Sequence, residues 1–322
     1  MSNAIKSESM MRVEGLKKYF ETPDGLLHAV DDVDFEIKKG ETLGLVGESG
    51  CGKSTIGRLM LRLLEPTGGK VNFDGKYIGE LSNRQLQKTR RDMQMIFQDP
   101  FSSLNPRSTV SEAIAEPLII HKMVKKRNGD LEKEVLRLMD TVGLAERLIN
   151  SYPHELDGGR RQRIGVARAL ALNPKFIVAD EPVSALDVSI QAQILNLLMD
   201  LQEELELTYL FITHDLSVVK HISDTIAVMY LGKLVEKAPT KSLFNNTLHP
   251  YTKALLSAIP VPSLDVEKDK ILIKGEITSP IEPKPGCRFA PRCNHAMEKC
   301  FSTDPELIEI ETDHFVSCFL HE

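Results

Sequence analysis

A complete phosphate-loop pattern near the start of the chain is its strongest indication of chemistry. The pattern G-x-x-x-x-G-K-[ST] is matched by Gly47, Glu48, Ser49, Gly50, Cys51, Gly52, Lys53 and Ser54. It follows a short apolar run at 42–46 and precedes a segment with helical spacing at 54–64, the context that the pattern requires. Its glycines let backbone N–H groups wrap a phosphate, while Lys53 supplies charge and the Ser54 hydroxyl is a ligand for Mg²⁺. The pattern predicts a site for a nucleotide phosphate.

Two carboxylates end another apolar run. Asp180 and Glu181 directly follow Phe176–Ala179. Without other signals, such a pair would be a solvated turn. Beside a phosphate loop, Asp180 is placed to hold Mg²⁺ and Glu181 to orient and polarise the attacking water.

Two further polar residues follow predicted strands. Gln98 comes after Met93–Phe97, and His214 comes after Tyr209–Thr213. Ligands bind at the carboxyl edge of open α/β sheets, so we expect both side chains to reach the γ-phosphate or its water.

A second candidate anion site opens a predicted helix, with the sequence Leu156, Asp157, Gly158, Gly159, Arg160. Two glycines at a helix N-terminus favour anion binding. One phosphate loop and one distant anion site indicate a nucleotide that is shared between two subunits.

The elements that must position these residues alternate between strand and helix. Val33, Phe35 and Ile37 alternate with polar residues as a half-buried strand does, and residues 225–237 predict a hairpin that turns at Leu231 and Gly232. Residues 108–172 are mainly helical. The pattern predicts an α/β fold with a mostly parallel sheet and a helical insertion.

The composition narrows the class of protein to which the chain can belong. Forty Lys and Arg against 46 Asp and Glu give a net charge of −6, which disfavours a nucleic-acid binder. No apolar run approaches the roughly 20 residues that span a bilayer, and residues 1–11 lack the pattern of a signal peptide. We therefore expect a cytoplasmic protein that docks on a membrane through partners.

The length predicts about two domains. Eight prolines lie in residues 1–238 and nine in 239–322, which indicates an appended C-terminal domain.

Taken together, these motifs resemble the ATP-binding subunit of an ABC transporter over about residues 10–260. The resemblance implies a P-loop ABC ATPase domain with a parallel-sheet core, an antiparallel β part and a helical subdomain. It implies ATP hydrolysis with Mg²⁺. By resemblance, the Walker A loop is Gly47–Thr55, and the Walker B pair is Asp180 and Glu181. The Q-loop glutamine is Gln98, the signature is Leu156–Arg160, the D-loop is Ser184–Asp187, and the switch histidine is His214. The aromatic residue that stacks on adenine is Tyr19, with Phe20 as the alternative.

Three segments narrow the resemblance to oligopeptide and dipeptide importers, in particular to their second, F-type, ATPase subunit. They are residues 249–260, residues 287–293, and Gln98-Asp99-Pro100 through Asn105-Pro106. This likeness implies an ATPase domain at 1–240 with a helical subdomain at about 108–172, and an importer-type extension at 241–322. The implied partners are a paralogous ATPase subunit, two membrane-spanning permeases and an extracytoplasmic peptide-binding protein, at the cytoplasmic face of the membrane. ATP-driven closure of the ATPase dimer would power peptide import.

Four cysteines gather in the extension, with the spacing C-x5-C-x6-C-x17-C: Cys287, Cys293, Cys300 and Cys318. The spacing alone leaves the metal undecided. The resemblance implies a structural [4Fe–4S] cluster, with zinc, aided by His295 and His314, and free thiols as alternatives. We expect Arg288, Arg292 and Lys299 to offset the thiolate charge. Cys51 is expected to be an inert spacer.

Other functions stay open. Glutathione or nickel importers share the subfamily, and a soluble ABC ATPase of translation or DNA repair, or a metal-sensing scaffold, is a further alternative.

The signature departs from the family pattern Leu-Ser-Gly-Gly-Gln at Asp157 and Arg160. A carboxylate cannot donate to a γ-phosphate, so the two ATP sites of a heterodimer should be unequal, although Asp157 also suits a helix N-cap.

Overall fold

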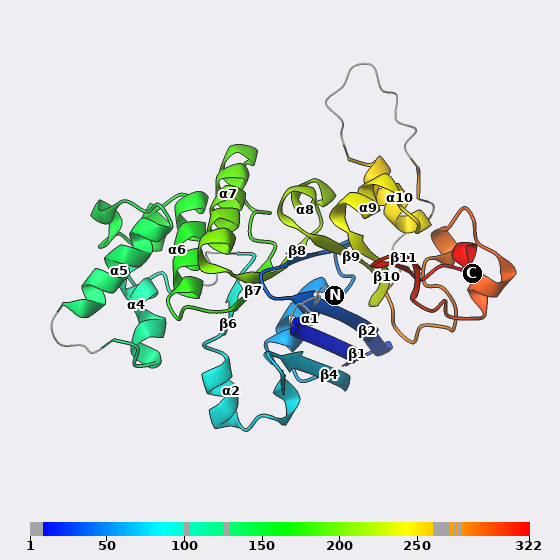
Figure 1. Ribbon diagram of the computed structural model, residues 1–322, viewed down its shortest axis with the longest axis horizontal. Helices are drawn as coiled ribbons and strands as arrows, with labels where there is room; N and C mark the ends of the chain where they lie inside the picture. Colours follow the sequence, from blue (N-terminus) through cyan, green and yellow to red (C-terminus); the bar gives the residue numbers. More distant parts are fainter. Residues whose placement is uncertain (1–8, 100–103, 125–128, 260–270, 274, 276–278) are drawn as a thin grey trace, which may run out of the picture. The chain divides into compact units, whose positions relative to one another are not determined.

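A computed structural model of the chain describes residues 9–99, 104–124, 129–259, 271–273, 275 and 279–322 (Figure 1). Pro100 and Pro260, which belong to the importer-like segments, lie outside the described residues. The described chain forms two compact units. The first comprises residues 38–40 and 80–210, and the second comprises residues 9–37, 41–79 and 211–322.

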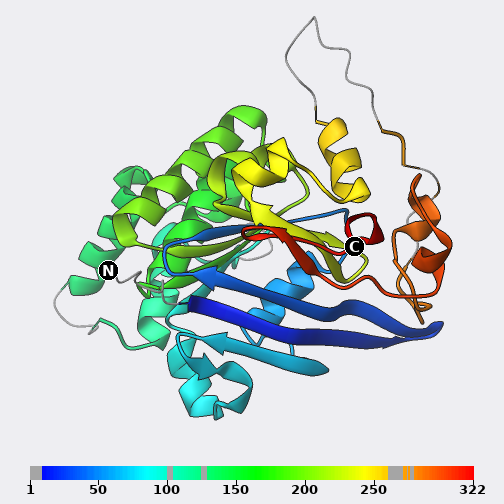
Figure 2. The same cartoon turned by 45° about the vertical axis from the view of Figure 1, so that its right-hand side comes forward.

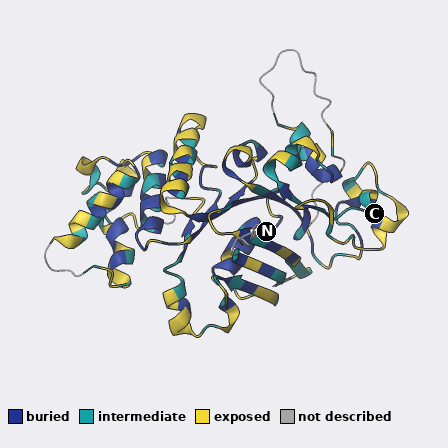
Figure 3. Cartoon of the chain, in the orientation of Figure 1, coloured by how far each residue is buried: buried dark blue, intermediate teal, exposed yellow. Residues whose placement is uncertain are grey.

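In the second unit, a sheet carries the strand that leads into the phosphate loop. Strand β3 (Thr42–Val46) pairs parallel with β9 (Thr225–Tyr230), and β9 pairs antiparallel with β10 (Lys233–Pro239). β10 continues to β12 (His314–Val316) and β11 (Ile308–Glu311). The residues of β3 and β9 are almost all buried (Figure 3). The predicted hairpin with its turn at Leu231 and Gly232 is confirmed.

A second sheet of this unit has the strand order β2-β1-β4-β5. Its strands are β1 (Ser9–Thr22), β2 (Gly25–Lys38), β4 (Gly68–Phe73) and β5 (Lys76–Tyr77). The predicted alternation holds in β2, where Val33, Phe35 and Ile37 are buried and the residues between them are more exposed.

Helix α1 (Lys53–Met60) follows the phosphate loop and ends earlier than the predicted residue 64. Leu61 caps it, and the next residue, Arg62, takes a left-handed φ of 49°, which stops helical hydrogen bonding. The unit also contains α8 (Leu216–Ile222), α9 (Thr240–Asn245) and α10 (Pro250–Ser257).

Helix α10 begins at the sequence His249-Pro250-Tyr251, and each of the three residues has a role there. The N-cap His249 is 1% exposed, and its Nδ1 accepts a hydrogen bond from the Tyr251 N–H at 3.1 Å. Burial lowers the pKa of His249 to about 4, so the ring is neutral and Nδ1 can accept. Pro250 occupies the first helical position, where a missing N–H costs nothing.

A buried carboxylate joins the C-terminal strands to this helix. Glu236 on β10 accepts the N–H of Leu248 at 2.8 Å and of His249 at 3.1 Å, and it lies 2.9 Å from Nε2 of His314. Glu236 and His314 are both fully buried. The carboxylate is therefore compensated by several partners, as a buried charge must be.

The C-terminal part of the chain also contacts the β1–β2 hairpin, as Figure 2 shows. The Leu26 N–H donates to Glu282 Oε1 at 2.8 Å, and the His28 N–H donates to the carbonyl of Pro280 at 2.9 Å. Three short 3-10 helices follow, at Ala290–Arg292, Glu298–Phe301 and Phe319–His321.

In the first unit, two parallel strands lie beside a group of helices. β6 (Met93–Ile96) pairs with β7 (Phe176–Asp180). The stretch predicted to be helical contains α4 (Val110–Ile120), α5 (Asp130–Thr141) and α6 (Gly158–Leu170), together with 3-10 turns at Glu146–Leu148 and Pro153–Glu155.

Helices α2 (Asn83–Thr89) and α7 (Val188–Leu205) complete the first unit, and a short 3-10 helix, Ile78–Glu80, crosses into it. Strand β8 (Thr208–Thr213) begins in the first unit and ends in the second. Among the described residues, no helix combines the length and the apolar character needed to cross a membrane.

Candidate nucleotide-binding site

The phosphate loop joins β3 to α1 and presses closely against neighbouring backbone. A Cβ atom on Gly47 would lie 2.3 Å from the carbonyl oxygen of Met229, and one on Gly52 would lie 2.1 Å from that of Ala29. Gly52 also caps α1 in a left-handed conformation, with a φ of 108°. Both glycines are therefore required by space, whereas Ser49 and Gly50 are exposed at the mouth of the loop.

The lysine of the loop is turned onto the loop itself. Lys53 is 5% exposed, and its ammonium donates to the carbonyl oxygens of Gly47 at 2.8 Å and of Glu48 at 3.0 Å. Ser54 and Thr55 follow it in the first turn of α1. Cys51 is buried inside the loop, and burial raises the pKa of its thiol, in keeping with the expected spacer.

Glu48 is held from two directions by the C-terminal part of the chain. Its N–H donates to the hydroxyl of Tyr251 at 2.9 Å. Its carboxylate accepts from both terminal nitrogens of Arg292, at 2.8 Å and 3.3 Å. Burial alone would lower the pKa of Arg292, but its hydrogen bonds to Glu48 and to Tyr230 raise it.

Tyr19 lies on β1 and is fixed at its ring and at its hydroxyl. Its ring stacks on His28 with centroids 3.9 Å apart, and its hydroxyl donates to Asp31 Oδ1 at 2.5 Å. Burial alone would raise the pKa of Asp31, but this hydrogen bond and the charges of Lys233 and Arg288 lower it.

A chain of hydrogen bonds runs from Tyr19 to the phosphate loop. Beyond the Tyr19 hydroxyl bond to Asp31, the Asp31 N–H donates to the Gly232 carbonyl, and the Gly232 N–H donates to the Cys51 carbonyl, each at 2.9 Å. Phe20 follows Tyr19 on the strand, so its side chain points to the opposite face, where Lys18 lies 5.0 Å from the ring centroid. Of the two aromatics, Tyr19 is the one linked to the loop.

In the first unit, two of the predicted residues meet at the ends of parallel strands. Gln98 follows β6, Glu181 follows β7, and Gln98 Nε2 donates to Glu181 Oε2 at 2.9 Å. Glu181 adopts a left-handed φ of 46°, which is uncommon for a residue other than glycine and is often found at functional sites. The amide therefore holds the carboxylate that the sequence predicts to polarise water.

The other predicted residues also lie at strand ends or helix starts. Asp180 closes β7 and is 3% exposed, and His214 is exposed directly after β8. In the predicted D-loop, the Ser184 hydroxyl donates to the Glu181 carbonyl at 3.1 Å, and Asp187 caps α7 by accepting from the Ile190 N–H at 3.1 Å.

The signature segment begins α6, and Asp157 is its N-cap. Asp157 Oδ1 accepts the Arg160 N–H at 2.8 Å, and Asp157 Oδ2 lies 3.4 Å from the Arg160 guanidinium. The capping interpretation of Asp157 is thus confirmed. A Cβ on Gly159 would lie 2.6 Å from the Ile190 side chain, so this glycine also allows α6 and α7 to pack closely, while Gly158 precedes it in the first turn.

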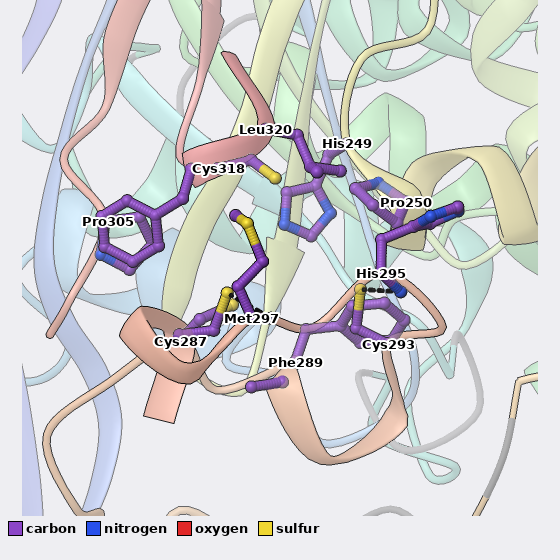
Figure 4. Close-up of a pocket in the computed structure, with 13 residues that line it drawn as sticks. His249, Pro250, Cys287, Phe289, Cys293, His295, Met297, Pro305, Cys318 and Leu320 are labelled. Atoms are coloured by element: carbon purple, nitrogen blue, oxygen red, sulfur yellow. Dashed lines mark hydrogen bonds between the residues drawn. The ribbon is translucent and has the colours of Figure 1, made fainter. Parts of the chain in front are cut away.

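The four C-terminal cysteines line one cavity (Figure 4). Its wall also includes His249, His295, Met297, Phe289 and Phe319, and Cys300 is 9% exposed. Burial and the neighbouring thiols Cys300 and Cys318 raise the pKa of Cys287 to about 11. Burial likewise raises the pKa of Cys293 and of Cys318. The structure thus places the four predicted ligands around one cavity, with Cys300 buried and the other three partly buried.

Three features of the predicted metal site are not confirmed. Within the described parts of the chain, no group of three or more His, Cys, Asp or Glu side chains could hold a metal ion as it stands. His314, considered as a zinc ligand, is committed to Glu236. The cations expected to offset thiolate charge pair with carboxylates instead, Arg288 with Asp31, Arg292 with Glu48 and Lys299 with Glu322.

Several residues of this site carry no signal in the sequence. Tyr251 reaches Glu48 from a helix 203 positions later, and Arg292 reaches it from 244 positions later. His28 and Asp31, which fix Tyr19, lie in a strand of ordinary alternating pattern. Only the fold brings these residues together.

Known sequences and structures place this arrangement in a family. The profile described as ABC transporter matches residues 30–184, and that described as oligopeptide/dipeptide transporter, C-terminal region, matches residues 235–300. The dimeric structure of an ATP-binding cassette in a post-hydrolysis state, bound to ADP and Pi, has a TM-score of 0.66 and 32% identity, covering 72% of this chain and 99% of that chain.

Curated relatives agree with these matches over nearly the whole chain. The oligopeptide transport ATP-binding protein AppF of Bacillus subtilis is 52% identical over 330 residues, which is 99% of each chain. OppF of the same species, another oligopeptide transport ATP-binding protein, is 55% identical over 307 residues, which is 92% of this chain and 100% of its own. A putative peptide import ATP-binding protein of Brucella ovis is 50% identical over 309 residues, covering 96% of this chain and 97% of its own.

The resemblance expected from the motifs is therefore confirmed: the chain belongs to the ATP-binding proteins of the ABC transporter family, with the C-terminal region of the oligopeptide and dipeptide transporters.

Proposed function

We propose that this chain is the ATP-hydrolysing subunit of an importer of dipeptides and oligopeptides. Identity of 52% over 99% of an oligopeptide transport ATP-binding protein carries the proposal. The match at residues 235–300 supports the same substrate class, and residues 241–322 would form the importer-type extension of an ATPase domain at 1–240. The glycine-rich loop and the Gln98–Glu181 contact support ATP hydrolysis.

Each predicted residue has a role in this mechanism. The backbone of Gly47–Thr55 cradles the phosphates, and Lys53 exchanges its two carbonyl partners for phosphate oxygens. The Tyr19 ring stacks on adenine. Glu181, positioned by Gln98, polarises the attacking water, and His214 contacts the γ-phosphate.

The resemblance to ABC ATPases supplies the ligands for Mg²⁺. Asp180, Ser54 and Gln98 would hold it, and when bound it would neutralise phosphate charge. These are the hard oxygen ligands that Mg²⁺ prefers in sites that also hold phosphates.

The subunit would work in a complex at the cytoplasmic face of the membrane. Its partners are a paralogous ATPase, two membrane-spanning permeases and an extracytoplasmic peptide-binding protein. A pocket on the first unit supports permease docking, because it lies beside the Q-loop and is lined by Phe97, Pro117, Gln162 and Arg168 among others. Phe97 is 45% exposed, and Ile120 at the end of α4 is 59% exposed, as apolar residues at a partner interface are.

The reconstituted complex gives the first prediction. In proteoliposomes that contain the permeases, the paralogous ATPase and the binding protein, labelled oligopeptides should be taken up and should stimulate ATP hydrolysis. Glu181→Gln should bind ATP normally and lose uptake, because the amide keeps the shape but not the charge that polarises water. Uptake of nickel or glutathione in place of peptides would contradict the proposed substrate. Glu181→Gln hydrolysis near the wild-type rate would contradict the assignment of Glu181.

Asp157 gives a prediction about the ATPase pair. Its carboxylate caps α6 and cannot donate to a γ-phosphate, so the ATP site to which this signature contributes should be impaired. Asp157→Ser keeps an N-cap and supplies a hydroxyl, so turnover of the assembled complex should rise. The number of ATP molecules trapped per complex should rise as well. If neither changes, the two sites are not made unequal by Asp157. Ser82→Asp, the reverse exchange at the N-cap of α2, is a matched control for capping and should leave turnover unchanged.

We propose further that the four cysteines of the small C-terminal region bind a [4Fe–4S] cluster. Their donor set and their shared cavity support it. Two of the sulfurs already accept backbone N–H groups, Cys293 from His295 at 3.3 Å and Cys300 from Met297 at 3.4 Å, and such hydrogen bonds stabilise thiolates in iron–sulfur sites. Binding requires the thiols to deprotonate and to shift into ligand positions. When bound, the cluster cross-links a region too small to form a large core of its own.

The metal content distinguishes the alternatives. Anaerobically purified protein should be brown and contain about four iron and four sulfide per chain, as thiolate-bound cubane clusters do. Cys300→Ser should lose both the colour and the iron, because it removes one of the four thiolate ligands. Cys51→Ser is the matched control and should keep the iron. Colourless protein with stoichiometric zinc would contradict the cluster.

A further inference from the structure

Two arginines next to cysteines of the C-terminal region reach opposite ends of the candidate ATP site. Arg292 directly precedes Cys293, its side chain is 10% exposed, and it binds the carboxylate of Glu48 in the phosphate loop through both terminal nitrogens. It also lies 3.3 Å from the Tyr230 hydroxyl and 5.9 Å from the centre of that ring. Such a bidentate pair fixes orientation as well as distance.

At the other end, Arg288 directly follows Cys287 and is 9% exposed. It donates to Asp31 and to the Leu231 carbonyl. Asp31 also accepts the Tyr19 hydroxyl, while Lys233 lies 3.9 Å from its other oxygen and His28 Nδ1 lies 3.3 Å away. Arg288 thus fixes the carboxylate on which the position of the Tyr19 ring depends.

We propose that Arg288 and Arg292 are positioning residues for ATP, Arg288 for the adenine end through Asp31 and Tyr19, and Arg292 for the phosphate end through Glu48. The inference rests on the proposed roles of Tyr19 and the phosphate loop. It makes residues 288–292 part of the nucleotide site, although neither arginine is expected to touch the nucleotide. The arginines act by keeping Tyr19 and Glu48 in place before ATP arrives, and preorganisation of this kind improves affinity.

A purely structural role would predict something different. If the two arginines only attached the C-terminal region to the rest of its unit, removing either would lower thermal stability and leave the affinity for nucleotide unchanged. The two roles can be distinguished because Arg288 and Arg292 contact different ends of the ATP site. Inorganic tripolyphosphate engages only the phosphate end, whereas ATP engages both ends.

Isothermal titration of the full-length chain with MgATP and with magnesium tripolyphosphate tests the proposal. Arg292→Gln should raise the Kd of both ligands by about fivefold, which corresponds to about 1 kcal/mol. Arg288→Gln should raise the Kd of ATP by a similar factor and leave that of tripolyphosphate unchanged. Arg12→Gln is the matched control, because it removes an Arg–Glu pair of 2.8 Å on the same unit, and both affinities should stay at the wild-type values.

Several outcomes would overturn the proposal. Folded Arg288→Gln and Arg292→Gln proteins that bind both ligands like the wild type, with only a lower melting temperature, would show a structural role alone. An equal loss of tripolyphosphate and ATP binding in Arg288→Gln would refute the adenine-end assignment. If Arg288→Gln fails to fold, Arg288→Lys retains the charge without the planar fork and should show the same selective loss.

The result is separable from the proposed function. Failure of the wild-type protein to bind either ligand would contradict the proposed ATP site itself. Normal ATP binding without peptide uptake in the reconstituted complex would refute the importer and leave the positioning roles standing.

Discussion

The phosphate loop depends on a backbone contact that leaves no room for side chains. The carbonyl oxygens of Ala29 and Met229 approach Gly52 and Gly47 so closely that any Cβ would collide with them. This contact fixes the loop between β2 and β9 and makes those strands part of the site. The hydrogen-bond chain from Cys51 through Gly232 and Asp31 to Tyr19 depends on the same placement. The loop is thus shaped by its surroundings as well as by its own glycines.

Local patterns were enough to predict much of this molecule. Strand ends at β6 and β7 place Gln98 and Glu181 where parallel-strand geometry requires, and they are in contact. The pattern of α1 was less informative, because the helix ends where Arg62 turns left-handed, and periodicity does not show such a stop. Asp157 fits both a cap and an impaired phosphate contact in the sequence, and the structure confirms the cap.

The C-terminal region shows where sequence reasoning fails. Arg288, Arg292 and Lys299 lie between cysteines, so proximity along the chain favoured a role near the thiolates. In the fold each pairs with a carboxylate, and two of these carboxylates, Asp31 and Glu48, come from the nucleotide site. Separations of more than 200 positions decide the contacts with Asp31 and Glu48, and no local pattern encodes them. The gathering of four thiols around one cavity was, in contrast, anticipated from their clustering.

We infer that the C-terminal region holds the phosphate loop in place before nucleotide binds. Hydrogen exchange at the Glu48 N–H in nucleotide-free protein tests this claim most directly, because that group donates to Tyr251 Oη at 2.9 Å. Tyr209→Phe is a matched control, since the Tyr209 hydroxyl is buried and has no hydrogen-bond partner among the described residues. We expect the Glu48 N–H to exchange slowly in the wild type and in Tyr209→Phe, and much faster in Tyr251→Phe. Equally fast exchange in all three proteins would contradict a phosphate loop held by the C-terminal region.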